Sequence, residues 1–173
     1  MRFFDASFSN LDPDGSRAVW RDYVSRHLPR ISSRLPHAFR EFVDSATSGT
    51  PGLNVHDGLL VEFAGDIPAG RAVLVLYVGD QQIGYHQLSL TFVGALRLPS
   101  LLPQVREIAR RRVEFLHDEA DLSESGLPAY RLSHTGSTQP LEFLFTDFAY
   151  SVRKLATRIN LASTPSTVRE ILE

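Results

Sequence analysis

Two His-Asp dipeptides, His56-Asp57 and His117-Asp118, are the residues of this sequence best suited to chemistry. Imidazole nitrogens and carboxylate oxygens bind transition metals, and hydrolases use such metals to activate water. Adjacent side chains on a strand point to opposite faces, so one dipeptide cannot easily present both groups to one ion. A site that takes one residue from each pair, such as His56 with His117, remains geometrically possible.

The favoured interpretation of these pairs is structural. Each aspartate would accept backbone N–H groups where a strand starts, and each histidine would pack beside the turn. On this interpretation no residue has a catalytic role, and we expect neither a metal nor a cofactor.

An acidic stretch, residues 114–124, offers a second kind of site. On a strand, Glu119 and Asp121 share one face while Asp118 lies on the other. Such a pair could bind a cation, act as an acid and base, or attract a basic partner. It could equally be a solvated strand edge, where like charges deter aggregation. We take Glu119 and Asp121 as the candidate partner-binding residues.

Composition excludes several function classes. The 173 residues include no cysteine, which excludes a disulfide scaffold, a Cys-ligated metal and a cysteine nucleophile. A formal net charge of −2 gives no basic field that would predict binding to nucleic acid. Neither a Gly-x-Ser-x-Gly motif nor a glycine-rich phosphate loop occurs. No apolar stretch approaches the roughly twenty residues of a membrane span, so we expect a cytoplasmic protein.

The secondary-structure elements that position the His-Asp pairs and the acidic stretch can also be predicted. The first is a helical segment at residues 11–46. Apolar residues there recur at steps of three and four. Pro29 and Pro36 each remove a backbone donor, which predicts breaks near Leu28 and Leu35. One apolar stripe of this segment is expected in the core: Trp20, Tyr23, Phe39 and Phe42.

From residue 53 the hydrophobic period changes to that of strands. Residues 53–94 predict three strands separated by glycine-containing turns, and residues 113–148 predict three more. Residues 104–112 could be a short helix or the start of the next strand. The tail, 149–173, contains Thr164-Pro165, which favours a capped short helix.

The two strand regions resemble each other. Residues 55–60, VHDGLL, recur 61 positions later as residues 116–121, LHDEAD, and each copy leads into two further strands. This repeat predicts two similar three-strand units in which His56 and His117 are equivalent. We therefore expect one α+β domain over residues 1–173, with the helical segment packed on an antiparallel sheet or partly closed barrel of about six strands.

The strand motifs together resemble a group of small uncharacterised bacterial proteins. The motifs lie at residues 53–57 (LNVHD), 90–92 (LTF), 115–119 (FLHDE) and 141–148 (LEFLFTDF), within roughly residues 53–150. Some members of that group are associated with toxin–immunity systems, and no catalytic residues come with the resemblance. It implies a non-enzymatic immunity-type or accessory protein that sequesters another protein, such as a toxin. The alternatives are a metal-dependent hydrolase that uses the His-Asp pairs, and a structural subunit that forms a homodimer through a sheet edge.

Overall fold

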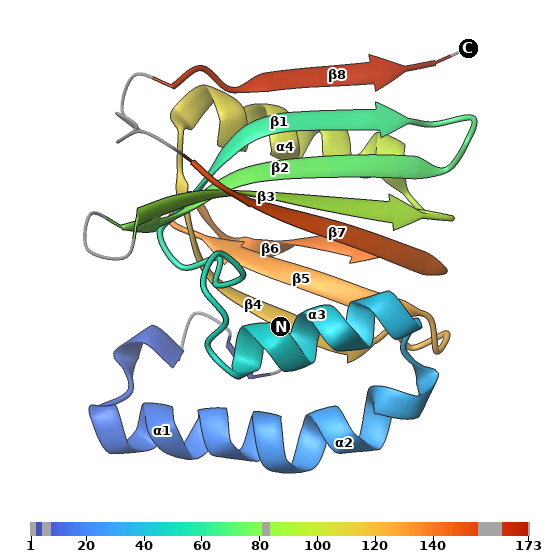
Figure 1. Ribbon diagram of the computed structural model, residues 1–173. Helices are drawn as coiled ribbons and strands as arrows, with labels where there is room; N and C mark the ends of the chain where they lie inside the picture. Colours follow the sequence, from blue (N-terminus) through green and yellow to red (C-terminus); the bar gives the residue numbers. More distant parts are fainter. Residues whose placement is uncertain (1–2, 5–7, 81–83, 156–163, 173) are drawn as a thin grey trace.

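The computed structural model describes residues 3–4, 8–80, 84–155 and 164–172. Helices pack against a single eight-stranded sheet, which confirms the expected α+β class (Figure 1). The sheet is not closed into a barrel, since β6 and β7 are the two ends of its strand order. None of the helices in the described part is long and apolar enough to cross a membrane.

The N-terminal segment is one nearly continuous helical rod followed by a separate helix. Its elements are α1 (Pro13–Asp22), a π turn (Tyr23–His27), α2 (Leu28–Ile31), a 3-10 turn (Ser32–Arg34) and α3 (His37–Thr47). The break expected near Leu28 is wrong. Pro29 offers no N–H, and the preceding turn widens so that Leu28 N–H bonds to Tyr23 C=O instead of ending the helix. The break at Leu35 is confirmed, because that residue is extended.

In the described residues, seven strands of the sheet lie in the order β6-β5-β4-β1-β2-β3-β7, and an eighth strand pairs with β1 off this path. They are β1 (Gly58–Asp66), β2 (Arg71–Asp80), β3 (Gly84–Val93), β4 (Glu114–Leu122), β5 (Pro128–His134), β6 (Ser137–Leu144), β7 (Asp147–Lys154) and β8 (Thr167–Ile171). Neighbours along this order are antiparallel, and β8 adds to β1 in parallel. The two expected three-strand units are therefore present as β1-β2-β3 and β4-β5-β6, joined through the pair β1/β4.

Two strands lie in the tail, where the sequence favoured at most a helix. β7 alternates Phe148, Tyr150 and Val152 and pairs with β3 along its whole length. The helix expected after Thr164 is wrong, since residues 167–171 are β8 beside β1. Residues 156–163 lie outside the described part.

Residues 104–112 are resolved as helix, because α4 (Leu98–Arg111) runs through most of them. The helix starts earlier than the sequence suggested, and its first turns include two prolines. Leu101, Val105 and Ile108 of α4 are buried, and the helix packs on β1, β6 and β8.

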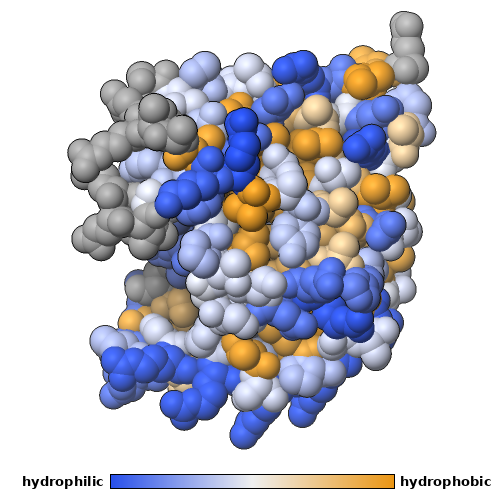
Figure 2. All heavy atoms as spheres, in the orientation of Figure 1, coloured by the Kyte–Doolittle hydropathy of each residue, from blue (hydrophilic) through white to orange (hydrophobic). Residues whose placement is uncertain are grey.

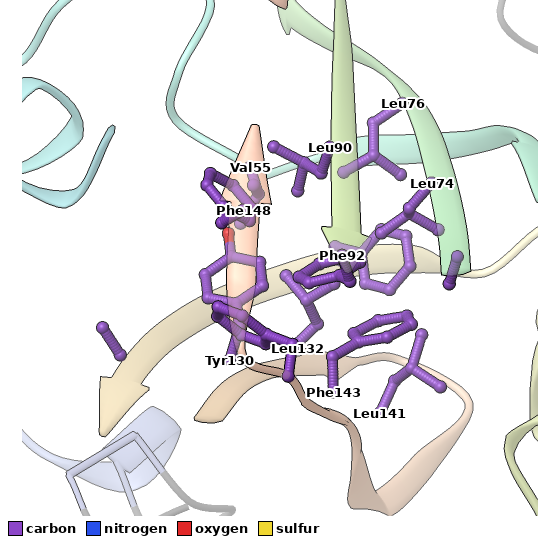
Figure 3. Packing of buried hydrophobic residues seen from close by; sticks show 14 of the residues in the cluster. Val55, Leu74, Leu76, Leu90, Phe92, Tyr130, Leu132, Leu141, Phe143 and Phe148 are labelled. Carbon is purple, nitrogen blue, oxygen red and sulfur yellow. The ribbon is translucent and has the colours of Figure 1, made fainter. Parts of the chain in front are cut away.

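The core forms where the sheet curls upon itself. Phe92 of β3 stacks on Phe143 of β6 with ring centroids 4.2 Å apart, and Tyr130 and Phe148 lie beside them (Figure 3). Phe39 and Phe42 of α3 pack edge-on against Tyr130.

Three members of the expected apolar stripe are buried, and one is not. Tyr23, Phe39 and Phe42 lie in the core as predicted. Trp20 is 43% exposed, so its placement in the core was wrong. The outer surface of α1 and α2 is mainly hydrophilic, as the helical periodicity requires (Figure 2).

Candidate functional site

A pocket of about 830 Å³ lies between the helical segment and the edge of the sheet at β4. We call it the helix–sheet pocket. Its apolar walls come from the N-terminal residues, α1, α3 and β4, and they include Phe4, Phe8, Trp20, Val24, Val43 and Ala46. Its polar lining includes Arg17, Arg21, Asn54, His56, His117 and Asp118.

Aromatic rings form one wall of the helix–sheet pocket. The Phe4 ring centroid lies 5.0 Å from that of Phe8, 5.0 Å from that of Tyr23 and 5.6 Å from that of Trp20. Phe8 also meets the ring of His117 edge-on at 4.9 Å. The rings hold one another in place, so the wall is built before any ligand arrives.

His56 and His117 meet at the pocket, as a site built from both dipeptides requires. Gly58 pairs with Phe115 at the end of the short β1/β4 ladder, and His56 and His117 lie just beyond that pair. Their ring centroids are 5.6 Å apart. His56 precedes the first residue of β1 by two positions, whereas His117 is the fourth residue of β4.

The first His-Asp dipeptide lies in a turn before β1, not on a strand as expected. Asp57 has a positive φ of 59°, and its N–H bonds to the C=O of Phe115. The side chains of the dipeptide face each other, with His56 Nδ1 3.1 Å from Asp57 Oδ2, and both are exposed.

The second dipeptide lies on β4 and is half-buried. Burial, followed by the nearby charge of His56, lowers the pKa of His117. Burial raises the pKa of Asp118 to about 6, although a hydrogen bond from the Tyr130 hydroxyl at 3.1 Å opposes that rise. At neutral pH the imidazole of His117 is therefore uncharged, and the neighbouring Asp118 carboxylate is ionised but has a pKa of about 6, close to neutrality.

The described residues contain no group of three or more His, Asp or Glu side chains that could hold a metal ion. The pair His56 and His117 supplies two imidazoles, and zinc sites in proteins use three or four ligands. In the described part, the hydrolase alternative therefore has two of the ligands that it needs and lacks a third.

Glu119 and Asp121 do not form the exposed acidic edge that the sequence suggested. They share one face of β4, as predicted, but that face is covered, and Glu119 is fully buried. Arg131 of β5 lies opposite, with Nη1 3.2 Å from Glu119 and 2.8 Å from Asp121. Because both carboxylates are held by this guanidinium, the structure gives no support to a partner-binding role for them.

Further contacts complete this ion cluster. Glu142 lies 2.5 Å from Arg131 Nε, and His27 Nε2 lies 3.1 Å from Asp121 Oδ1. Glu119 also accepts the backbone N–H groups of Phe3 and Phe4, at 2.8 and 3.3 Å. The cluster thereby fixes the N-terminal aromatic residue that lines the helix–sheet pocket.

The sequence did not reveal the aromatic wall or the arginines beside it. Phe4 and Phe8 precede the first helix, where no period could be recognised. Trp20 followed the helical stripe and was assigned to the core. Arg17 and Arg21 stand one turn apart on α1, a spacing that could have identified one basic face.

Comparison of this chain with protein families, curated proteins and solved structures finds no match. The resemblance to toxin–immunity proteins therefore stays a prediction.

Proposed function

We propose that the protein binds a small amphipathic molecule in the helix–sheet pocket. One observation carries the proposal: a cavity of about 830 Å³ with mainly apolar walls and a few polar side chains. Ligand sites in proteins have roughly this size and this lining. The apolar walls would hold the body of the ligand, and the imidazoles and Asn54 would fix its polar group.

Binding in this pocket would remove apolar surface of both the pocket wall and the ligand from water. Trp20 is 43% exposed although it lines the pocket, so part of its ring faces solvent. Each 100 Å² of apolar surface that a ligand covers contributes about 2.5 kcal/mol. A ligand with a hydrocarbon chain or ring system would gain most from this wall.

Capture of another protein, as an immunity-type protein would do, stays a prediction. The residues expected to bind that protein were Glu119 and Asp121, and both form ion pairs with Arg131. The helix–sheet pocket gives the better-supported function because its surfaces are open to a ligand.

Equilibrium binding of Nile red, an uncharged apolar dye, tests the proposal. We expect saturable binding of one dye per chain, measured as a rise in dye fluorescence. Ala46→Phe places a ring into the pocket from α3 and should weaken binding at least tenfold. Glu41→Phe, an exposed position on the same helix outside the pocket, should leave the affinity unchanged. Absence of saturable binding, or equal binding by a folded Ala46→Phe variant, would contradict the proposal.

A further inference from the structure

We infer that the ligand of the helix–sheet pocket is an amphipathic acid, with an apolar body and one carboxylate. This inference rests on the proposed function and adds the charge of the ligand to it. Basic side chains line the pocket on two sides: Arg17 and Arg21 from α1, and the imidazoles of His56 and His117 from the sheet.

The two arginines give the helical side of the pocket a positive charge. They stand four residues apart, so both lie on the same face of α1. Arg17 is paired with Asp14 at 3.1 Å, but both groups are largely exposed, and such a pair contributes little. The planar guanidinium groups match the geometry of a carboxylate and can donate two parallel hydrogen bonds to it.

The imidazole pair gives the sheet side of the pocket donors for an anion. The ring centroids of His56 and His117 are only 5.6 Å apart. One anion placed beside them can therefore accept an N–H from each ring. His56 Nδ1 also lies 3.1 Å from Asp57 Oδ2, and both of these groups are exposed.

One carboxylate of the protein, that of Asp118, also lines the pocket. It accepts the hydroxyl proton of Tyr130 at 3.1 Å, so part of its charge is already engaged. The guanidinium groups of Arg17 and Arg21 outnumber it, and the two imidazoles add hydrogen-bond donors. The lining as a whole therefore favours an acid over an amine as the polar group of the ligand.

The test uses three ligands with the same ten-carbon chain and different head groups: decanoate, 1-decanol and decyltrimethylammonium, all below their micellar concentrations. Trp20 lines the pocket and is the sole tryptophan of the sequence, so its emission reports binding directly. At pH 7 we expect decanoate to bind at least tenfold more tightly than decyltrimethylammonium, and more tightly than decanol.

Three variants identify the origin of that preference. At least one of Arg21→Gln and His117→Gln should lower the ratio of decanoate to decanol affinity threefold or more. Arg30→Gln, an exposed arginine of α2 outside the pocket, should leave this ratio unchanged. Circular dichroism of each variant checks that it is folded.

The outcomes separate this inference from the proposed function. Equal binding of the three ligands, or tighter binding of the ammonium, would overturn the acid while leaving an amphipath pocket in place. A preference for decanoate that neither Arg21→Gln nor His117→Gln lowers would also overturn it. Failure of all three ligands and of Nile red to bind would overturn the pocket itself.

Discussion

Replacing Glu119 by alanine should be among the most destabilising single changes in β4. The carboxylate is fully buried, and it accepts hydrogen bonds from Phe3 N, Phe4 N and Arg131 Nη1. Its removal leaves the buried N–H of Phe4 without that acceptor, and an unsatisfied donor of this kind costs about 1–3 kcal/mol. Breaking a buried ion pair costs about 3–5 kcal/mol, but here the guanidinium keeps Asp121 and Glu142.

These contributions together give an expected loss of about 3–5 kcal/mol for Glu119→Ala, because the retained carboxylates offset part of the ion-pair term. Glu119→Gln keeps an acceptor oxygen for the backbone and should lose only about 1–2 kcal/mol. At about 2–4 °C per kcal/mol for a chain of this size, the alanine variant should melt roughly 6–20 °C lower.

Urea titration followed by circular dichroism measures these losses as changes in the free energy of unfolding. Glu114→Ala, at an exposed position on the same strand, is the matched control and should change stability by less than about 0.5 kcal/mol. If Glu119→Ala loses less than about 1 kcal/mol, the carboxylate does not anchor the N-terminal residues, and the wall of the pocket is held by other contacts.

Three further predictions use the same titration. Trp20→Ala should lose about 1–3 kcal/mol because the ring is 43% exposed, whereas Phe39→Ala should lose about 3–5 kcal/mol; a larger loss for Trp20→Ala than for Phe39→Ala would contradict the exposure of Trp20. Because the pKa of Asp118 is about 6 in the folded protein and 3.8 ordinarily, the native state binds the proton more tightly and stability falls as pH rises from about 4 to 6. Asp118→Asn should remove that fall and be more stable at pH 7 by about 1–3 kcal/mol, and an unchanged pH profile would refute the assignment. Gly79→Ala should lose at least about 2 kcal/mol more than Gly49→Ala, because both have positive φ but only at position 79 does a Cβ collide with a backbone oxygen of β3; similar losses would contradict this.

Local patterns were enough to predict most of the elements, because helices and hairpins are specified by neighbouring residues. The helical segment and the strands of both three-strand units follow from periodicity and turn residues. The two strands of the tail do not. β8 forms because β1 offers an edge about a hundred residues earlier in the chain, as the pairing of Phe63 with Val168 shows. The local preference of residues 167–171 for a strand is weak, so the partner strand decides whether the strand forms. A local sequence pattern contains no information about that partner.

The candidate site was predictable only where the repeat pointed to it. The repeat matched His56 with His117, and the structure brings their rings to 5.6 Å of each other. The acidic pair shows the limit of this approach. Alternation on β4 correctly put Glu119 and Asp121 on one face, but the register with β5 decides that Arg131 covers this face. Whether a charged face meets water or a cation is thus a tertiary property.

The pocket follows from how briefly the two three-strand units pair. β1 and β4 are paired only at Gly58–Leu59 and Glu114–Phe115, and farther along β1 its edge is occupied by β8. This leaves β4 with an open edge, where the hydroxyl of Tyr23 accepts the N–H of Ala120 at 2.7 Å and contacts its C=O at 3.4 Å. A tyrosine side chain thus stands where a neighbouring strand would otherwise lie, and it holds the helical segment one ring length away from the sheet. The space beside that ring is the helix–sheet pocket, and His56 and His117, just beyond the last β1/β4 pair, lie at its wall because the pairing ends there.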